Sequence, residues 1–434
     1  MRVTSRRRLL AAAPLSLLLL RAGLRSTAAQ AASHDSTAVL QREINAAAET
    51  GRVAVIPPGV SYVSNLSLPS TVRLVGAGPS TRLVAIGDGP MLSAEQADSI
   101  AIENMRFDGD GRAPGGNAGL IEMRDVLDLR FIDCAIERVA GSGLLMERCG
   151  GHIERSTFRT IADAALHSLD SLGLSVVDNE IEDCGNAGIQ IWRSAEGDDR
   201  SVLRGNRVTR IRADHGGDGE YGNGINIFRA GGIVCEGNVV RACAFSAVRY
   251  NAGSNATIVS NNIGDCGEVA LYVEFGFQGA VVEANVIDGA SSGISITNFD
   301  QGGRLAACNG NVVRNLDRPN PQNNGVYGIG IDVEADTVVS GNTIDNATGT
   351  GLRLGYGSAL RNVIAANNVI SDCGIGIDVS VVGNKGPASI SNNVIAGAKH
   401  GVIVGMAWDK IQSDDLLRDA AQYPQLTMAG NIVR

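Results

Sequence analysis

Short runs of alternating apolar and polar residues fill most of the chain, and one phrase recurs eleven times between Ser142 and Val402. The phrase is a small residue followed by apolar, variable and apolar positions, and the commonest step between copies is 23 residues. A period of this length predicts a solenoid, in which each repeat packs against the next. The copies begin at Gly143, Ala165, Gly188, Gly224, Ala247, Ala270, Gly293, Gly330, Gly351, Gly376 and Gly401.

An Asn lies about nine residues before most copies. This column runs through Asn179, Asn206, Asn238, Asn261, Asn285, Asn311, Asn342, Asn368 and Asn393, with Cys134 and Ser156 in the same place earlier. Each repeat therefore has three short runs rich in Val and Ile, separated by turn residues, which predicts three strands. The expected fold is an all-β parallel β-helix of about 12 coils. Inward Asn side chains about 4.8 Å apart would bond to one another, a structural role.

The two ends differ from the repeats. Residues 1–31 carry the twin-arginine pattern Ser5-Arg6-Arg7-Arg8, a short apolar run and a small-x-small cleavage sequence, so we expect an export signal and a periplasmic or secreted protein without a membrane span in the mature chain. Residues 32–50 predict a capping helix whose apolar face holds Val39, Leu40, Ile44 and Ala47. The β-helix domain then covers residues 51–405, and residues 406–434 form a C-terminal cap with a short helix near 413–421.

After the helix come Val53-Ala54-Val55-Ile56-Pro57-Pro58-Gly59 and Val72-Arg73-Leu74-Val75-Gly76-Ala77-Gly78. This order resembles the N-terminus of the pectate-lyase-like superfamily of right-handed, single-stranded parallel β-helix proteins. With the twin-arginine pattern and the Asn repeats, the chain resembles the twin-arginine-translocated repeat proteins. The resemblance implies a right-handed helix, the twin-arginine export machinery as a partner, and a polysaccharide or oligosaccharide as ligand. The motifs of the superfamily's polygalacturonases, mannuronan epimerases and classical pectate lyases are missing.

Charge and reactive side chains exclude several functions. The net charge is −9, and residues 1–31 hold six arginines and no acids, so the mature chain carries −15 and is a poor nucleic-acid binder. The eight cysteines copy the repeat spacing, which favours free buried thiols. The five histidines form no metal pattern, and we expect no cofactor. Calcium binding through Asp214, Asp218 and Glu220 lacks EF-hand spacing.

The residue two positions after each repeat Gly should face outward and form a vertical column. That column reads Leu145, His167, Gln190, Asn226, Arg249, Tyr272, Ser295, Asp332, Arg353, Asp378 and Ile403. A second outward column, two residues further on, includes Trp192, Phe228, Asn251 and Glu274. We expect both columns to be exposed to solvent.

Two long connections leave the same corner of the solenoid. Asn206 to Gly224 and Asn311 to Gly330 use eighteen and nineteen residues, whereas most others use eight or nine. The first carries His215 and Tyr221. At 4.8 Å per coil these loops would form two walls roughly 20 Å apart, with the floor between them open.

This floor offers groups for glycan chemistry. For a uronate polymer, Arg249 would neutralise the carboxylate while Tyr272 or His215 acts as base and acid. For a neutral glycan, Glu274 with Asp218 or Glu220 would supply two carboxylates. The expected substrate-binding side chains are Gln190, Trp192, Tyr221, Asn226, Phe228 and Asn251.

Two functions stay open at this point. The first is binding and modification of a polysaccharide, with a lyase or epimerase favoured over a glycoside hydrolase. The second is a non-catalytic envelope repeat protein with a structural or glycan-binding role. In the second interpretation the outward polar side chains are ordinary surface residues, His167 is a surface histidine, and Asp332, Arg353 and Asp378 form a surface ion-pair ladder.

Overall fold

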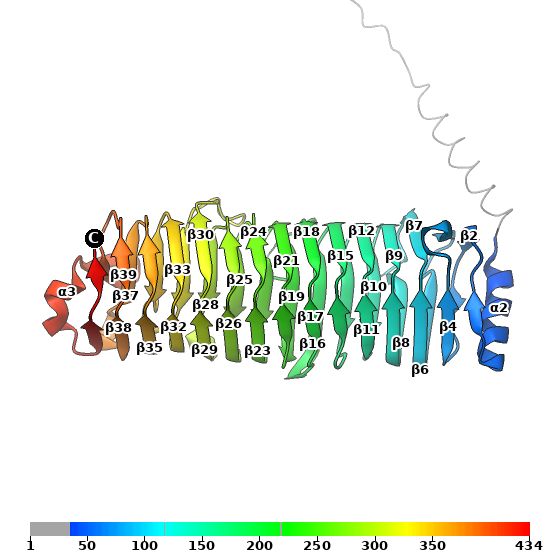
Figure 1. The fold of residues 1–434 in the computed structure, drawn as a ribbon, viewed down its shortest axis with the longest axis horizontal. Helices are drawn as coiled ribbons and strands as arrows, with labels where there is room; N and C mark the ends of the chain where they lie inside the picture. Colours follow the sequence, from blue (N-terminus) through cyan, green and yellow to red (C-terminus); the bar gives the residue numbers. More distant parts are fainter. Residues whose placement is uncertain (1–34, 117, 218) are drawn as a thin grey trace, which may run out of the picture.

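The chain folds into a long rod of stacked coils (Figure 1). The computed structural model describes residues 35–116, 118–217 and 219–434; the export signal expected at residues 1–31 lies outside them. The rod contains about 14 turns, somewhat more than the 12 that the repeats predict. The all-β parallel β-helix is therefore confirmed.

Three ladders of parallel strands run along the rod, one strand of each ladder per coil. The first ladder is a separate 15-stranded sheet. It consists of β2 (Gly59–Val63), β5 (Thr81–Ala85), β7 (Arg106–Arg112), β9 (Ala135–Val139), β12 (Thr157–Ile161), β15 (Glu180–Cys184), β18 (Arg207–Ile211), β21 (Val239–Cys243), β24 (Asn262–Gly264), β27 (Val286–Asp288), β30 (Val312–Leu316), β33 (Thr343–Ala347), β36 (Val369–Ser371), β39 (Val394–Ala396) and β43 (Ile432–Val433).

The second ladder holds the repeat glycines, and we call it the repeat-glycine ladder. It consists of β3 (Leu66–Ser67), β6 (Leu92–Glu103), β8 (Gly119–Ile132), β10 (Ser142–Glu147), β13 (Ala164–Leu169), β16 (Ala187–Asp198), β19 (Asn223–Gly231), β22 (Val248–Asn251), β25 (Val269–Glu274), β28 (Ser292–Ile296), β31 (Ile329–Val333), β34 (Thr350–Leu354), β37 (Ile375–Ser380) and β40 (Ile403–Ala407). A short β41 (Lys410–Ser413) pairs with β40 in antiparallel fashion.

The third ladder shares the long strands β6 and β8 with the second. Its other strands are β1 (Val53–Val55), β4 (Val72–Val75), β11 (Gly151–Glu154), β14 (Ser175–Val177), β17 (Val202–Arg204), β20 (Val234–Glu236), β23 (Ser254–Val259), β26 (Gln278–Glu283), β29 (Arg304–Asn309), β32 (Ala335–Ser340), β35 (Arg361–Ala366), β38 (Ala388–Ser391) and β42 (Leu426–Ala429).

Helices lie at the two ends of the rod (Figure 1). Helix α2 (Thr37–Thr50) buries Leu40, Ile44 and Ala47 against the first coil, as the pattern predicts, but Val39 is 53% exposed and not part of that face. The C-terminal end carries α3 (Leu416–Asp419) and the 3₁₀ turn η4 (Ala420–Gln422). Three further 3₁₀ turns are η1 (Gly78–Ser80), η2 (Phe299–Gln301) and η3 (Val382–Asn384).

The Asn column forms the continuous ladder that the repeats predict. Asn179 donates its backbone N–H (3.1 Å) and its Nδ2 (3.0 Å) to Oδ1 of Asn206, and its Nδ2 also donates to a carbonyl of the coil before (2.9 Å). The same contacts repeat coil by coil as far as Asn431. Because every buried amide finds partners, the column satisfies the turns and has a structural role. All eight cysteines are free and buried.

Candidate functional site

Strand register aligns the outward column as predicted over almost its whole length. Asn226 lies opposite Arg249, and Arg249 lies opposite Tyr272. The exception is the last position, where Asp378 pairs with Val404 and not with Ile403. The prediction is wrong there because Gly376 donates its N–H to the carbonyl of Gly401, which shifts the final coil by one residue.

The expected exposure of this column is wrong. Asn226 is 3% exposed and Arg249 is 6% exposed, although both point away from the core, and Glu274 of the second outward column is 1% exposed. The first long loop folds down onto Asn226. Nδ2 of Asn226 donates to the carbonyl oxygens of Gly219 (3.0 Å) and Glu220 (3.1 Å) in that loop. The floor between the two expected walls is therefore covered and not open.

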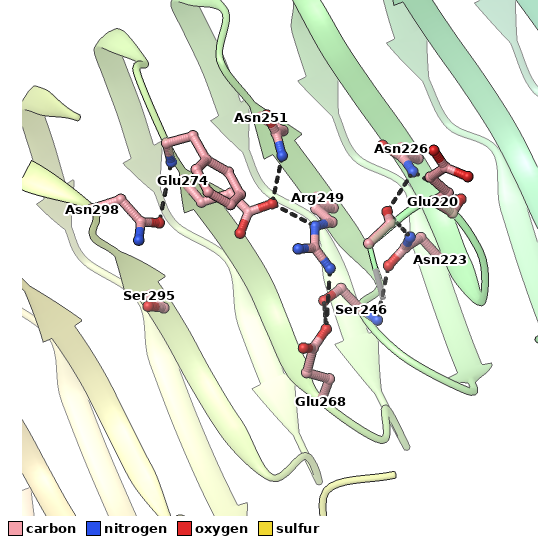
Figure 2. A network of polar contacts seen from close by, with 12 residues as sticks. Glu220, Asn223, Asn226, Ser246, Arg249, Asn251, Glu268, Glu274, Ser295 and Asn298 are labelled. Atoms are coloured by element: carbon pink, nitrogen blue, oxygen red, sulfur yellow. Dashed lines mark hydrogen bonds and ion pairs between the residues drawn. The ribbon is translucent and has the colours of Figure 1, made fainter. Parts of the chain in front are cut away.

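Arg249 lies at the centre of a buried ionic network (Figure 2). Its Nε donates to Oε1 of Glu274 at 2.6 Å, and its Nη1 lies 3.4 Å from Oε2 of Glu268. Asn251 donates to the same oxygen of Glu274 at 2.7 Å. The guanidinium also lies over the ring of Tyr272, 5.0 Å from its centroid. A cation paired with two carboxylates has little charge left for a third one.

The second long loop reaches the same network. Nε2 of Gln322 lies 3.5 Å from Oε1 of Glu268, and Asn320 in the same loop is buried. Burial raises the pKa of Glu268 and of Tyr272 above their ordinary values. The phenol of Tyr272 therefore stays protonated at neutral pH, which makes it a poor proton acceptor.

An open pocket lies on the N-terminal side of the first loop. Its volume is about 600 Å³. Four of the predicted site residues line it, namely Gln190, Trp192, His215 and Tyr221. The remaining lining comes from Gly116, Ala118, Arg124, Ala140, Gly141, Ser142, Leu145, Glu147, Ala162, Asp163, His167 and Leu169. The other predicted residues, Asn226, Phe228, Arg249, Asn251, Tyr272 and Glu274, do not line it.

The first loop makes this pocket because it leans toward the preceding coil. The backbone N–H of Asp214 donates to the carbonyl of Gly185, and that of Gly222 donates to the carbonyl of Asn186. His215 and Tyr221 therefore lie over β13 and β16, with their rings in an edge-to-face contact at 5.7 Å.

A buried amide sets the proton position on His215. Nδ2 of Asn186 contacts Oδ1 of Asp163 and Nδ1 of His215, each at 2.9 Å, while its Oδ1 accepts from the backbone N–H of His215 at 2.9 Å. Exchanging the amide oxygen and nitrogen would place like groups against each other, so this orientation is fixed. Because Nδ2 can only donate, Nδ1 of His215 accepts and its proton resides on Nε2.

His167 is half-buried and lines this pocket. Its Nδ1 lies 2.7 Å from Oε1 of Gln190, and its ring meets Trp192 edge to face at 5.2 Å. Burial lowers the pKa of His167, so the ring is neutral at pH 7. The pocket thus holds two histidines, and Asn186 sets the proton position on one of them, His215.

The carboxylates of the C-terminal coils are also covered, so their description as a surface ladder is wrong. Asp378 is 1% exposed and pairs with Arg353 at 3.0 Å. Burial raises the pKa of Asp332 and of Glu334 to about 7. Among the described residues, Oδ1 of Asp332 has no hydrogen-bond partner.

One acidic residue of the first loop already has a cationic partner. Asp214 pairs with Arg212 at 2.9 Å, and Asp218 lies outside the described residues. In residues 35–116, 118–217 and 219–434, no group of three or more His, Cys, Asp or Glu side chains is placed to hold a metal ion. The same part of the chain has no helix that is long and apolar enough to span a membrane.

Comparison with known proteins identifies the family. The family model described as "Right handed beta helix region" matches residues 142–309 and 194–361, which together cover just over half of the chain. The chain therefore belongs to the right-handed β-helix family. No curated protein matches the sequence significantly.

Solved structures of similar shape are distant in sequence. The catalytic unit of a GH87 α-1,3-glucanase from Streptomyces thermodiastaticus strain HF3-3 is 15% identical with a TM-score of 0.44, over 92% of this chain and 66% of the glucanase. PfbA, a surface adhesin of Streptococcus pneumoniae, is 13% identical with a TM-score of 0.49, over 88% and 91%. A PL6 alginate lyase in complex with a trisaccharide is 12% identical with a TM-score of 0.47, over 88% and 89%.

Proposed function

We propose that this protein binds a glycan in the pocket that Gly116, Ala118 and the first long loop help to line. One observation supports this: Trp192 and two leucines, Leu145 and Leu169, share the pocket with Gln190, Asp163 and both histidines. An aromatic ring can stack on the apolar face of a sugar, while the polar groups bond to its hydroxyls. Glycan binding in this pocket needs no cofactor or metal ion in addition to these side chains.

Chemical modification of the glycan is a second candidate function. His167 and His215 line one pocket, and an imidazole can serve as the acid or the base of general acid–base chemistry. The uronate lyase or epimerase expected around Arg249 has less support, because that cation is held by Glu268 and Glu274. Hydrolysis through two carboxylates and a purely structural envelope role are the remaining alternatives.

Mutation of Trp192 tests glycan binding. The chain has two tryptophans, and Trp408 is 54% exposed near the C-terminal cap, where it contacts Tyr356. We expect Trp192→Ala to weaken strongly the retardation of the protein in gels containing polysaccharide, because the variant loses the aromatic face on which a sugar would stack. Trp408→Ala is the matched control and should be retarded like the parent. Equal loss in both variants, or none in either, would refute the assignment.

We also propose that the chain is a twin-arginine-translocated repeat protein that acts in the periplasm or outside the cell. The support is the sequence pattern at Arg6 and Arg7 alone. Replacing both residues by Lys should leave the protein in the cytoplasm with its signal uncleaved, as cell fractionation and N-terminal sequencing would show. Lys replacement of Arg21 and Arg25 is the control and should allow export. Continued export of the Arg6 and Arg7 variant would refute this route.

A further inference from the structure

We infer that the pocket accepts a glycan without carboxylates and discriminates against uronate polymers, a statement that rests on the proposed glycan binding. The reason is a local excess of fixed negative charge. The ion pairs of the described residues around the pocket show this excess.

On the N-terminal side, Arg124 and Glu147 line the pocket and belong to a cluster of two arginines and three carboxylates. Arg124 lies 3.4 Å from Glu122 and 3.6 Å from Glu147. Arg148 pairs with Asp125 at 2.6 Å and also with Glu147. Both guanidinium groups are thus already shared among carboxylates, and the cluster keeps one negative charge in excess.

The remaining sides add negative charge. Asp163 lines the pocket and accepts hydrogen bonds from two neutral donors, Oγ of Ser142 at 2.8 Å and Nδ2 of Asn186 at 2.9 Å. The first loop adds no unpaired cation here, because Arg212 is held by Asp214. His167 is neutral at pH 7 because burial lowers its pKa.

A uronate residue would bring one further negative charge into this environment. At about 6 Å and an effective dielectric constant near 40, one uncompensated charge costs about 1.4 kcal/mol, or roughly tenfold in affinity. A uronate-binding site would instead need a cation to pair with the substrate carboxylate. Arg249 cannot serve, because it lies under the first loop with its charge shared between Glu268 and Glu274.

A fluorescence titration measures this preference directly. In a Trp408→Phe protein, Trp192 is the sole tryptophan and reports occupancy of the pocket. The probes are hexasaccharides of matched length: uncharged cello-, xylo- and mannohexaose, the uronates hexagalacturonate and hexamannuronate, and the amino-sugar chitosan hexamer. We expect the best probe without carboxylates to bind about tenfold or more tightly than either uronate at low salt. High salt should narrow this gap.

A variant that removes one carboxylate tests the effect of pocket charge directly. Glu147→Gln removes one pocket carboxylate and should lower the ratio of the uronate to the uncharged dissociation constant severalfold. Glu180→Gln is the matched control, since Glu180 also pairs with an arginine, Arg159 at 2.8 Å, but lies on the 15-stranded sheet. Its ratio should equal that of the parent. A ratio that does not change in Glu147→Gln would overturn the inference.

The outcomes separate the two claims. Uronates that bind as tightly as the uncharged probes, or more tightly, would overturn the charge inference and leave glycan binding intact. Failure of every probe to quench Trp192 would refute glycan binding itself, and the inference with it.

Discussion

The contact between Asn186 and His215 shows how a buried amide determines what a pocket residue can do. Asn186 is fully buried, donates to both Asp163 and His215, and accepts from the backbone of His215. Nδ1 of His215 is therefore occupied by this hydrogen bond, and the ring nitrogen left for a ligand is Nε2, which is a proton donor and not a base. Asn186 is therefore a positioning residue.

The tautomer of His215 can be measured. In protein with ¹⁵N-labelled histidine, we expect His215 to show protonated Nε2 and bare Nδ1 at pH 7.5. Asn186→Ala should release this preference and lower the free energy of unfolding by about 1–3 kcal/mol, because buried partners lose their bonds. His152, which pairs with Glu154 at 3.3 Å on β11, is the internal control. A protonated Nδ1 on His215 in the parent would contradict the assignment.

Two carboxyls make stability depend on pH. Burial raises the pKa of Asp332 and Glu334 to about 7 in the folded protein, so between about pH 4 and 7 the folded state holds more protons than the unfolded state. The free energy of unfolding should therefore fall as pH rises through this window. Asp332→Asn should be more stable than the parent by about 1–2 kcal/mol at pH 8 and equal to it near pH 4.

Urea unfolding at pH 4 and pH 8 would check this. Asp317→Asn, at an exposed position of the second loop, should show no such pH-dependent gain. If Asp332→Asn lost stability at pH 8, its carboxylate would be a stabilising ion and not a strained one.

At the scale of elements, register was predictable and loop direction was not. Repeat spacing places Asn226, Arg249 and Tyr272 in one column because side-chain alternation and the 4.8 Å rise allow no other stacking. The loops were expected to stand as walls. The first loop instead leans toward the preceding coil because its backbone donors bond to Gly185 and Asn186, contacts that no local pattern encodes.

The pocket was missed for the same reason. His167 stood in the predicted column but was judged alone, since its partner His215 lies 48 residues further along the chain. Asp163 lies in a turn just before a repeat position and carried no signal. A stronger signal was available in Gln190 and Trp192, which stand one coil from His167 in the two predicted columns.

An Asn in the middle of the ladder should contribute more to the free energy of unfolding than an isolated buried Asn would. Asn285 donates to Asn311 and to the carbonyl of Ile258, and its Oδ1 accepts twice from Asn261. Asn285→Ala leaves these buried groups without hydrogen-bond partners, so we expect the free energy of unfolding in urea to fall by about 2–4 kcal/mol. Asn262→Ala, on the exposed side of the neighbouring coil, should lose less than 1 kcal/mol. Equal losses would show that the ladder is not cooperative.

For the whole molecule, the fold followed from one period because each coil contacts only its neighbours. The cysteines follow the same repeat and share one environment. All eight are buried, and burial raises the pKa of Cys134, Cys184, Cys235 and Cys308 to about 12. The thiolate form that reacts is therefore absent at these four positions at neutral pH, and burial shields all eight sulfur atoms from reagents.

Thiol labelling should act as an unfolding signal. With excess iodoacetamide at pH 8, we expect no modified cysteine in the native protein and eight in denaturant, counted by mass spectrometry. Partial labelling of the native protein, confined to one or two coils, would mean that the rod opens locally.

Because the thiols are buried only in the folded protein, it matters chemically whether the chain folds before or after the proposed export. A chain that enters an oxidising compartment before its coils have stacked would present eight cysteines that are able to cross-link at random. A chain that arrives already stacked would present none of them, and its surroundings could oxidise it only after a coil had come apart.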